Sequence, residues 1–263
     1  MKRENWIILV FAISFFASGL LHAELPYHMG VKIFKVNGVT FQLLYVPPGT
    51  FMMGSPSNEE GHKAEEIQHE VAITKGFWIG RTEVTQELYQ VIMGKNPSYY
   101  KGPNFPVENV SWNDSVKFIH RLNDLLPDGH FNLPSEAQWE YTCRAGSKGA
   151  YCFGNDGAKL DQYAWLGDNT HGKIRLQPVA TKKPNAWGIY DMHGNLWEWC
   201  VDWYGEYPIR ALSDPSGPPS GSEKVCRGGS WFSGKGGVRC ADRDHAPLDY
   251  TSTSVGFRLI WTP

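Results

Sequence analysis

The chain has 263 residues, of which 41% are hydrophobic and 14% aromatic, and its formal net charge is −2. Its 28 Gly, 17 Pro and 11 Trp exclude a disordered chain, a coiled coil and a mostly helical bundle, and they favour a compact, loop-rich fold. Because no basic patch stands out, nucleic acid is not expected as a partner.

The amino terminus has the pattern of a signal peptide. Lys2 and Arg3 precede an apolar run over residues 6–21, and Ala23 supplies a small residue before a cleavage site. The run is shorter than the ~20 residues of a membrane span. We therefore expect removal of residues 1–23, no membrane span after cleavage, and a secreted or periplasmic protein. An uncleaved anchor is the alternative.

The first part of the exported chain alternates predicted strands and loops. Residues 24–36 are expected to be a leader before a folded domain over residues 37–263. The apolar patterns of residues 39–46 and 77–80 predict strands. Between them, residues 55–70 are polar and acidic, so they predict a loop with solvated histidines.

Three helices are predicted next. Apolar residues recur at helical spacing from Val84 to Ile92, and Gly94 ends that helix. Ser111 and Ser135 each open another helix, because an acid or amide three residues later completes a capping box.

The remainder of the chain lacks helical signals. Residues 147–263 are rich in turns, Gly and Trp, and they predict short strands ending in a closing core strand over residues 255–261. No fixed-period repeat or long linker divides the chain. The economical prediction is one α+β domain with much irregular structure.

All five cysteines lie in the exported part, where disulfides can form. They are Cys143, Cys152, Cys200, Cys226 and Cys240. Because the number is odd, at least one is free or pairs between chains. The absence of C-x-x-C argues against a zinc knuckle or a thioredoxin-like pair.

Residues 191–199 are the densest candidate site. Asp191 and Glu198, with the carbonyls between them, could supply part of a calcium shell. In the alternative interpretation, Asp191 and Asn195 cap turns and Glu198 pairs with an arginine.

Residues 229–235 fit a P-loop pattern, but Gly236 stands where Ser or Thr would hold magnesium. We therefore expect a glycine-rich turn there and no nucleotide.

Seven segments form an ordered set of motifs along the chain. They are Val46–Ser55, Phe77–Thr85, Pro106–Trp112, Leu133–Tyr141, Pro184–Trp199, Arg227–Trp231 and Gly256–Leu259. With these motifs in this order, the sequence resembles the formylglycine-generating enzyme, or sulfatase-modifying factor, family. The resemblance implies a C-type-lectin-like α+β domain of low regular secondary structure. It also implies the family's reaction, oxidation of a sulfatase cysteine to formylglycine by oxygen at copper(I) held by two thiolates.

The sequence departs from the family at the copper ligands. The first redox cysteine would fall at Ser233, and residues 234–238, where the second would fall, contain no Cys. Because a serine hydroxyl cannot replace a copper thiolate, we expect no copper and no formylglycine-generating activity. Ser233, Ser230 and Trp197 are then degenerate remnants of the cleft.

The resemblance implies further features of the chain. Cys143 and Cys240 match a family disulfide, while a second family bridge falls on the aliphatic Ile119 and Leu259. The pairing of Cys152, Cys200 and Cys226 stays open.

A family calcium site matches the side chains of Asp191 and Glu198 and the carbonyls of Gly194 and Leu196. A second calcium site, near Trp165 and His171, lacks its ligands and is expected to be absent.

Three functions follow from these expectations. The first is an exported binding or accessory protein for an unknown protein or envelope ligand. The second is an enzyme of divergent chemistry, for which His193 and His245 are candidate iron ligands. The third is the formylglycine oxidase with Cys200 or Cys226 recruited.

Overall fold

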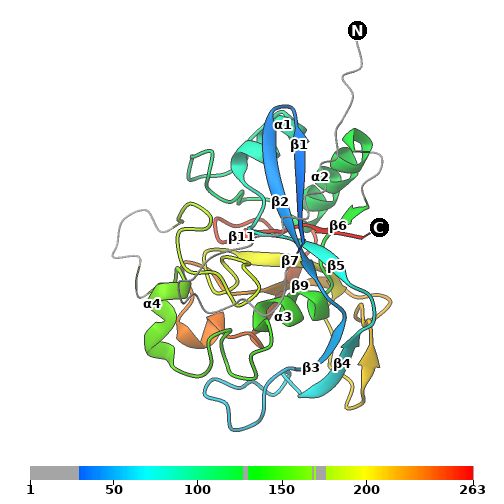
Figure 1. Cartoon of the computed structure of the whole chain (residues 1–263), viewed down its shortest axis with the longest axis vertical. Helices are drawn as coiled ribbons and strands as arrows, with labels where there is room; N and C mark the ends of the chain where they lie inside the picture. The colour runs from blue at the N-terminus through cyan, green and yellow to red at the C-terminus, as the bar shows by residue number, and fades with distance from the viewer. Residues whose placement is uncertain (1–29, 127–129, 168, 170–175, 263) are drawn as a thin grey trace, which may run out of the picture.

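The computed structural model describes residues 30–126, 130–167, 169 and 176–262 (Figure 1). The expected signal peptide lies outside the described residues. Three small sheets and three principal helices form one α+β body. Among the described residues, no helix combines the length and the apolarity that crossing a bilayer requires.

The largest sheet joins distant parts of the chain. Its strand order is β1 (Val31–Val36), β2 (Val39–Val46), β5 (Phe77–Gly80), β12 (Ile260–Trp261) and β6 (Phe131–Asn132). All neighbouring strands are antiparallel. The end of the chain therefore lies inside the sheet that its beginning opens.

The second part of the expected leader belongs to the fold. β1 pairs with β2 along its whole length. Asn37 and Gly38 connect them with φ values of 48° and 91°, as a two-residue hairpin turn requires. The predicted domain boundary at residue 37 was therefore too late, because Asn-Gly between two apolar runs is itself a hairpin signal.

Two further sheets complete the strand framework. One has the order β10 (Arg243–Pro247), β9 (Glu223–Arg227), β7 (Trp197–Trp203) and β11 (Val255–Gly256). The other has the order β3 (Gly49–Met53), β4 (His69–Ile73) and β8 (Leu212–Ser213).

The predicted closing strand is divided between two sheets. β11 pairs in parallel with β7, whereas β12 pairs with β5 and β6. Residues 257–259 cross between the sheets and are buried. The prediction of one continuous strand was wrong because an apolar run does not reveal a change of pairing partner.

The three predicted helices are confirmed. They are α1 (Gln86–Met93), α2 (Trp112–Leu125) and α3 (Glu136–Arg144). Ser111 and Ser135 each form the predicted reciprocal capping box, and Gly94 ends α1 with φ 75°. Short elements after residue 147 were missed because one turn carries no periodicity. They are η1 (Gly157–Lys159), α4 (Leu160–Tyr163) and η2 (Lys235–Val238).

Two large apolar clusters form the core. One packs α1 and α2 around Phe118, Leu122 and Trp199. The other surrounds α3 and contains Trp139 and Ile79. In Figure 1, α1 and α2 lie beside the β1–β2 hairpin, and α3 lies nearer the β3–β4 end.

The acidic loop of residues 55–70 is anchored more deeply than expected. His69, predicted to be solvated, is only 4% exposed. Its ring contacts Tyr207 with centroids 4.8 Å apart, and its Nδ1 is 2.9 Å from the Ile67 carbonyl. Glu66 is also buried and pairs with Arg239 at 2.6 Å. Composition alone gave no sign of these long-range partners.

Candidate functional site

Glu198 is held by a buried arginine. Its two carboxylate oxygens accept hydrogen bonds from Arg258 Nε at 2.5 Å and Nη2 at 2.6 Å. Trp139 Nε1 donates to Glu198 Oε2 at 2.7 Å. All three side chains are fully buried. Glu198 comes from β7, Trp139 from α3 and Arg258 from the crossing between β11 and β12. The three side chains therefore connect α3 to the two sheets that this crossing joins.

Asp191 lies in a left-handed turn beside a second acid. Its φ is 59°, and its Oδ2 accepts a 2.7 Å hydrogen bond from Ala180 N. Asn195 Nδ2 donates to Glu83 Oε1 at 3.1 Å, while Glu83 Oε2 is buried without a partner. Asp191 contacts Glu83 directly.

Glu83, Asp191 and Glu198 form an acidic cluster in which the carboxyl groups outnumber the positive charges. The buried acids Glu83, Asp191 and Glu198 are opposed by one guanidinium, that of Arg258. Burial raises the pKa of Asp191 to about 6. Burial and the two neighbouring carboxylates raise the pKa of Glu83. A bound cation would balance the charge and satisfy the orphaned oxygen of Glu83.

Asp191 and Glu198 share one buried region with Glu83 and Arg258, two residues that the sequence analysis did not connect to them. Asp191, Gly194 and Leu196 lie in the irregular segment before β7, Glu198 is the second residue of β7, and Gly194 has φ 87°. Glu83 was missed because a single acid before α1 has no local signal of burial. The alternative interpretation also finds support, since Asp191 accepts a turn N–H and Glu198 pairs with an arginine.

The loop expected to correspond to the copper site consists of hydroxyls and an exposed ring. Ser230 N donates to Ser233 Oγ at 3.0 Å, and Ser233 N donates to Ser230 O at 2.9 Å. Ser230 is 2% exposed, whereas Phe232 is 70% exposed. Trp197 is half-buried at the start of β7.

Four aromatic residues form a connected surface at this loop, which we call the aromatic strip: Tyr99, Tyr100, Trp231 and Phe232. Neighbouring ring centroids along it are 5.1, 6.3 and 5.9 Å apart. Tyr99 and Phe232, at its two ends, are 71% and 70% exposed. Trp231, between them, is 8% exposed and packs in a small core cluster, so the exposed aromatic surface is at the two ends of the strip.

Four of the five cysteines are buried. Cys143 Sγ and Cys240 Sγ lie 3.5 Å apart as free thiols. Cys200 and Cys226 are 0% and 3% exposed and belong to different core clusters. Burial raises the pKa of both thiols. Cys152 is half-buried.

His193 is a neutral, hydrogen-bonded core residue. Its Nδ1 is 2.7 Å from the Val238 carbonyl, and its Nε2 accepts from Cys152 N at 3.1 Å. Burial lowers the pKa of His193 to about 4. Cys143 Sγ lies 4.0 and 3.9 Å from the two ring nitrogens.

The described residues hold one close group of three potential ligand residues, and it contains a single histidine. The group is Cys143, His193 and Cys240. The other candidate, His245, forms a separate pair with Glu223 at 2.7 Å. No three-histidine iron site is therefore formed within the described part of the chain.

A loop-rich α+β domain with this order of motifs defines the class of sulfatase-modifying-factor-like proteins. The model of the sulfatase-modifying factor enzyme 1-like domain matches residues 34–263, so the chain belongs to this family.

The formylglycine-generating enzyme of Mus musculus is 32% identical over 216 residues, covering 76% of this chain and 55% of that protein. The enzyme of Streptomyces coelicolor is 34% identical over 171 residues, covering 59% and 52%. The chain thus spans about half the length of these relatives.

Solved structures confirm the fold. Treponema denticola variable protein 1 is 29% identical with a TM-score of 0.82, over 89% of this chain and 99% of that one. PvdO from Pseudomonas aeruginosa is 27% identical with a TM-score of 0.77, over 88% and 98%. The predicted C-type-lectin-like α+β class is therefore correct.

Proposed function

We propose that this chain is an exported binding or accessory member of the family, without the copper-thiolate site and its oxidase activity. The observation that carries the proposal is the loop over residues 230–238. Ser233 stands at the expected position of one copper ligand, and the rest of the loop offers no thiol. Serine is too hard and too weakly acidic to replace a copper(I) thiolate.

The remaining thiols support the absence of the reaction. Recruiting Cys200 or Cys226 would require a peptide and oxygen to reach buried side chains in two different cores. Burial also disfavours the thiolate that copper chemistry needs. Cys143 and Cys240 are equally buried, and their proximity supports the disulfide that the family implies.

The aromatic strip is the proposed binding face. It includes Trp231 and Phe232 of the altered loop and presents two rings, Tyr99 and Phe232, to solvent. We infer export from the signal-peptide pattern of residues 1–23. Export would expose this face to an unknown partner protein or envelope ligand.

The acidic cluster is a proposed calcium site. Asp191 and Glu198 would contribute carboxylates, and Gly194 and Leu196 would contribute carbonyls. The excess of carboxyl groups over positive charges and the unpartnered Oε2 of Glu83 support a cation there. A bound calcium ion would brace the turn against β7, a stabilising role without a part in catalysis.

The decisive experiment supplies a sulfatase-derived cysteine peptide with copper and oxygen and measures aldehyde by mass spectrometry. We expect no product above a no-enzyme control, and no copper(I) retained by the protein. Aldehyde formation by the unaltered chain would refute the proposal.

A double-cysteine variant provides the matched control. A Cβ added at Gly237 would lie 3.3 Å from Ser233 Cβ, so Ser233→Cys/Gly237→Cys places two thiols side by side in the loop. We expect this variant to bind copper(I) where the unaltered chain does not. Equal copper binding by both would show that other residues hold the metal.

A further inference from the structure

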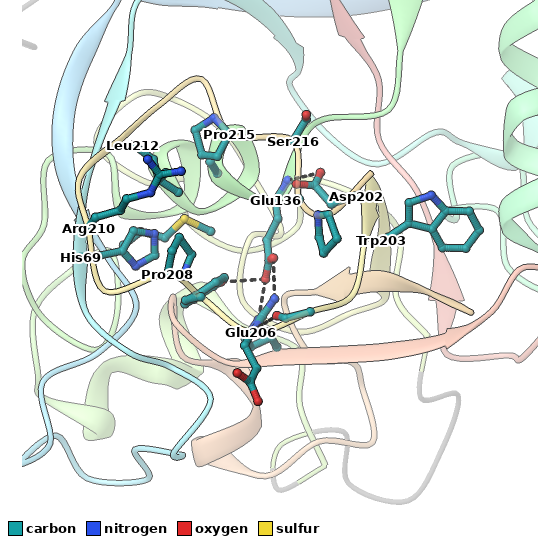
Figure 2. A pocket seen from close by; sticks show the side chains of 17 residues that line it. His69, Glu136, Asp202, Trp203, Glu206, Pro208, Arg210, Leu212, Pro215 and Ser216 are labelled. Carbon is teal, nitrogen blue, oxygen red and sulfur yellow. Dashed lines mark hydrogen bonds and ion pairs between the residues drawn. The ribbon is translucent and has the colours of Figure 1, made fainter. Parts of the chain in front are cut away.

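A second site lies in a cavity away from both the aromatic strip and the acidic cluster. The cavity has a volume of ≈ 380 Å³, within the ~300–1,000 Å³ range of small-molecule pockets. It lies between the start of α3, the β3–β4–β8 sheet and the loop of residues 205–218 (Figure 2). None of its lining residues belongs to either site described above.

Asp202 supplies a buried carboxylate to this cavity. It is 3% exposed, and its Oδ2 accepts a 2.8 Å hydrogen bond from Glu136 N at the first residue of α3. None of the ion pairs among the described residues includes Asp202. Because a buried charge is stabilised by a partner of opposite sign, the carboxylate is suited to a cation supplied by a ligand.

The basic side chains near Asp202 form hydrogen bonds with other groups. Arg243 forms a two-pronged pair with Glu136, at 2.8 and 2.7 Å. Lys224 donates to the Val201 carbonyl at 2.8 Å. Burial and the negative charge of Glu136 raise the pKa of Asp202 to about 7, against the smaller opposing effect of the Lys224 charge.

The opposite side of the cavity carries an arginine beside a buried histidine. Figure 2 shows His69 and Arg210 side by side there, across from Asp202 and Trp203. Arg210 is exposed and forms no ion pair with a described residue. A guanidinium in this position matches a carboxylate.

Apolar side chains complete the lining, namely Met53, Ala137, Leu212, Pro208, Pro215 and Pro218. They offer space for an aliphatic group between the acidic and basic sides.

We propose that this cavity binds a small α-amino acid with an aliphatic side chain. Its ammonium group would meet Asp202, its carboxylate would meet Arg210, and its side chain would lie against Met53 and Leu212. The inference is independent of the proposed loss of oxidase activity.

Three probes test the assignment on the full exported chain by ligand-observed NMR and calorimetry: L-leucine, 3-methylbutylamine and N-acetyl-L-leucine. We expect leucine to bind, the amine to bind more weakly, and the acetylated compound, which has no ammonium group, to fail. If leucine fails to bind, or if N-acetyl-leucine binds equally well, the proposal is overturned.

Variants assign the roles of the residues. Asp202→Asn keeps an acceptor for Glu136 N and should weaken leucine binding by at least about tenfold. Arg210→Gln should reduce the affinity for leucine to that of the unaltered chain for 3-methylbutylamine. Leu212→Trp should block the cavity without altering either charge. Glu206→Gln, at the exposed rim, is the matched control and should bind like the unaltered chain. Undiminished binding by Asp202→Asn would contradict the assignment.

Discussion

Replacing Arg258 by methionine should strongly destabilise the domain. The Arg258 guanidinium gives two hydrogen bonds to Glu198 and one each to the carbonyls of Gly80 and Tyr190, at 3.1 and 3.0 Å. Methionine fills part of the volume but supplies no donor. The variant therefore leaves Glu198 buried and unpaired, next to two other acids.

The expected loss follows from the burial of the pair. Breaking a fully buried ion pair by removing one partner costs about 3–5 kcal/mol. For a domain of this size, each kcal/mol lowers Tm by about 2–4 °C. Arg258→Met should therefore lower Tm by about 6–20 °C.

The assays are thermal and urea unfolding in EDTA, so that no bound cation compensates the unpaired acids. Arg121→Met is the matched control, because Arg121 is exposed and donates only to the Met93 carbonyl among the described residues. It should change stability by less than about 0.5 kcal/mol. Arg258→Met/Glu198→Gln removes the unpaired charge and should recover part of the loss. A loss below about 1 kcal/mol, or a double variant less stable than the single one, would refute the reasoning.

Three further predictions test other parts of the structure. Saturating calcium should raise Tm by about 5–10 °C, and Asp191→Ala should abolish this rise in differential scanning fluorimetry; an equal loss in chelator would indicate a packing role. If Cys143 and Cys240 are bridged, Cys143→Ser should increase the thiols titrated in the unfolded, unreduced protein by one, whereas a decrease by one would show free thiols. Since the pKa of Asp202 rises from its ordinary 3.8 to about 7 in the fold, the folded state retains a proton that the unfolded state releases. Its contribution to stability is fully present below pH 3.8 and declines as the pH rises towards 7. Asp202→Asn should flatten this decline in urea unfolding, and an unchanged pH profile would contradict the assignment.

The ends of the principal helices could be predicted because they depend on local chemistry. Ser111 and Ser135 begin α2 and α3 because a hydroxyl and the side chain three residues later satisfy the first free N–H groups, whatever the rest of the chain does. Gly94 ends α1 because glycine adopts a positive φ without strain. These signals span only a few residues, so they can be read without a fold.

The candidate site was predicted only in part. Asp191 and Glu198 belong to one short segment, and their proximity follows from the sequence. Arg258 lies 60 positions beyond Glu198, and Glu83 lies 112 positions before Asn195. Because one acid or arginine resembles another in sequence, only the packed structure shows which of them are buried together and where carboxyl groups outnumber positive charges.

The sequence by itself determined the family, the three helices and the absence of thiols in the altered loop, since each depends on residue identity or on short-range spacing. Tertiary structure alone decided that residues 255–261 divide between two sheets, that His69 is buried, and that Asp202 faces a cavity across from Arg210. Those features arise from pairing between distant segments, whose partners are selected by the packing of the whole domain and leave no local periodic signal.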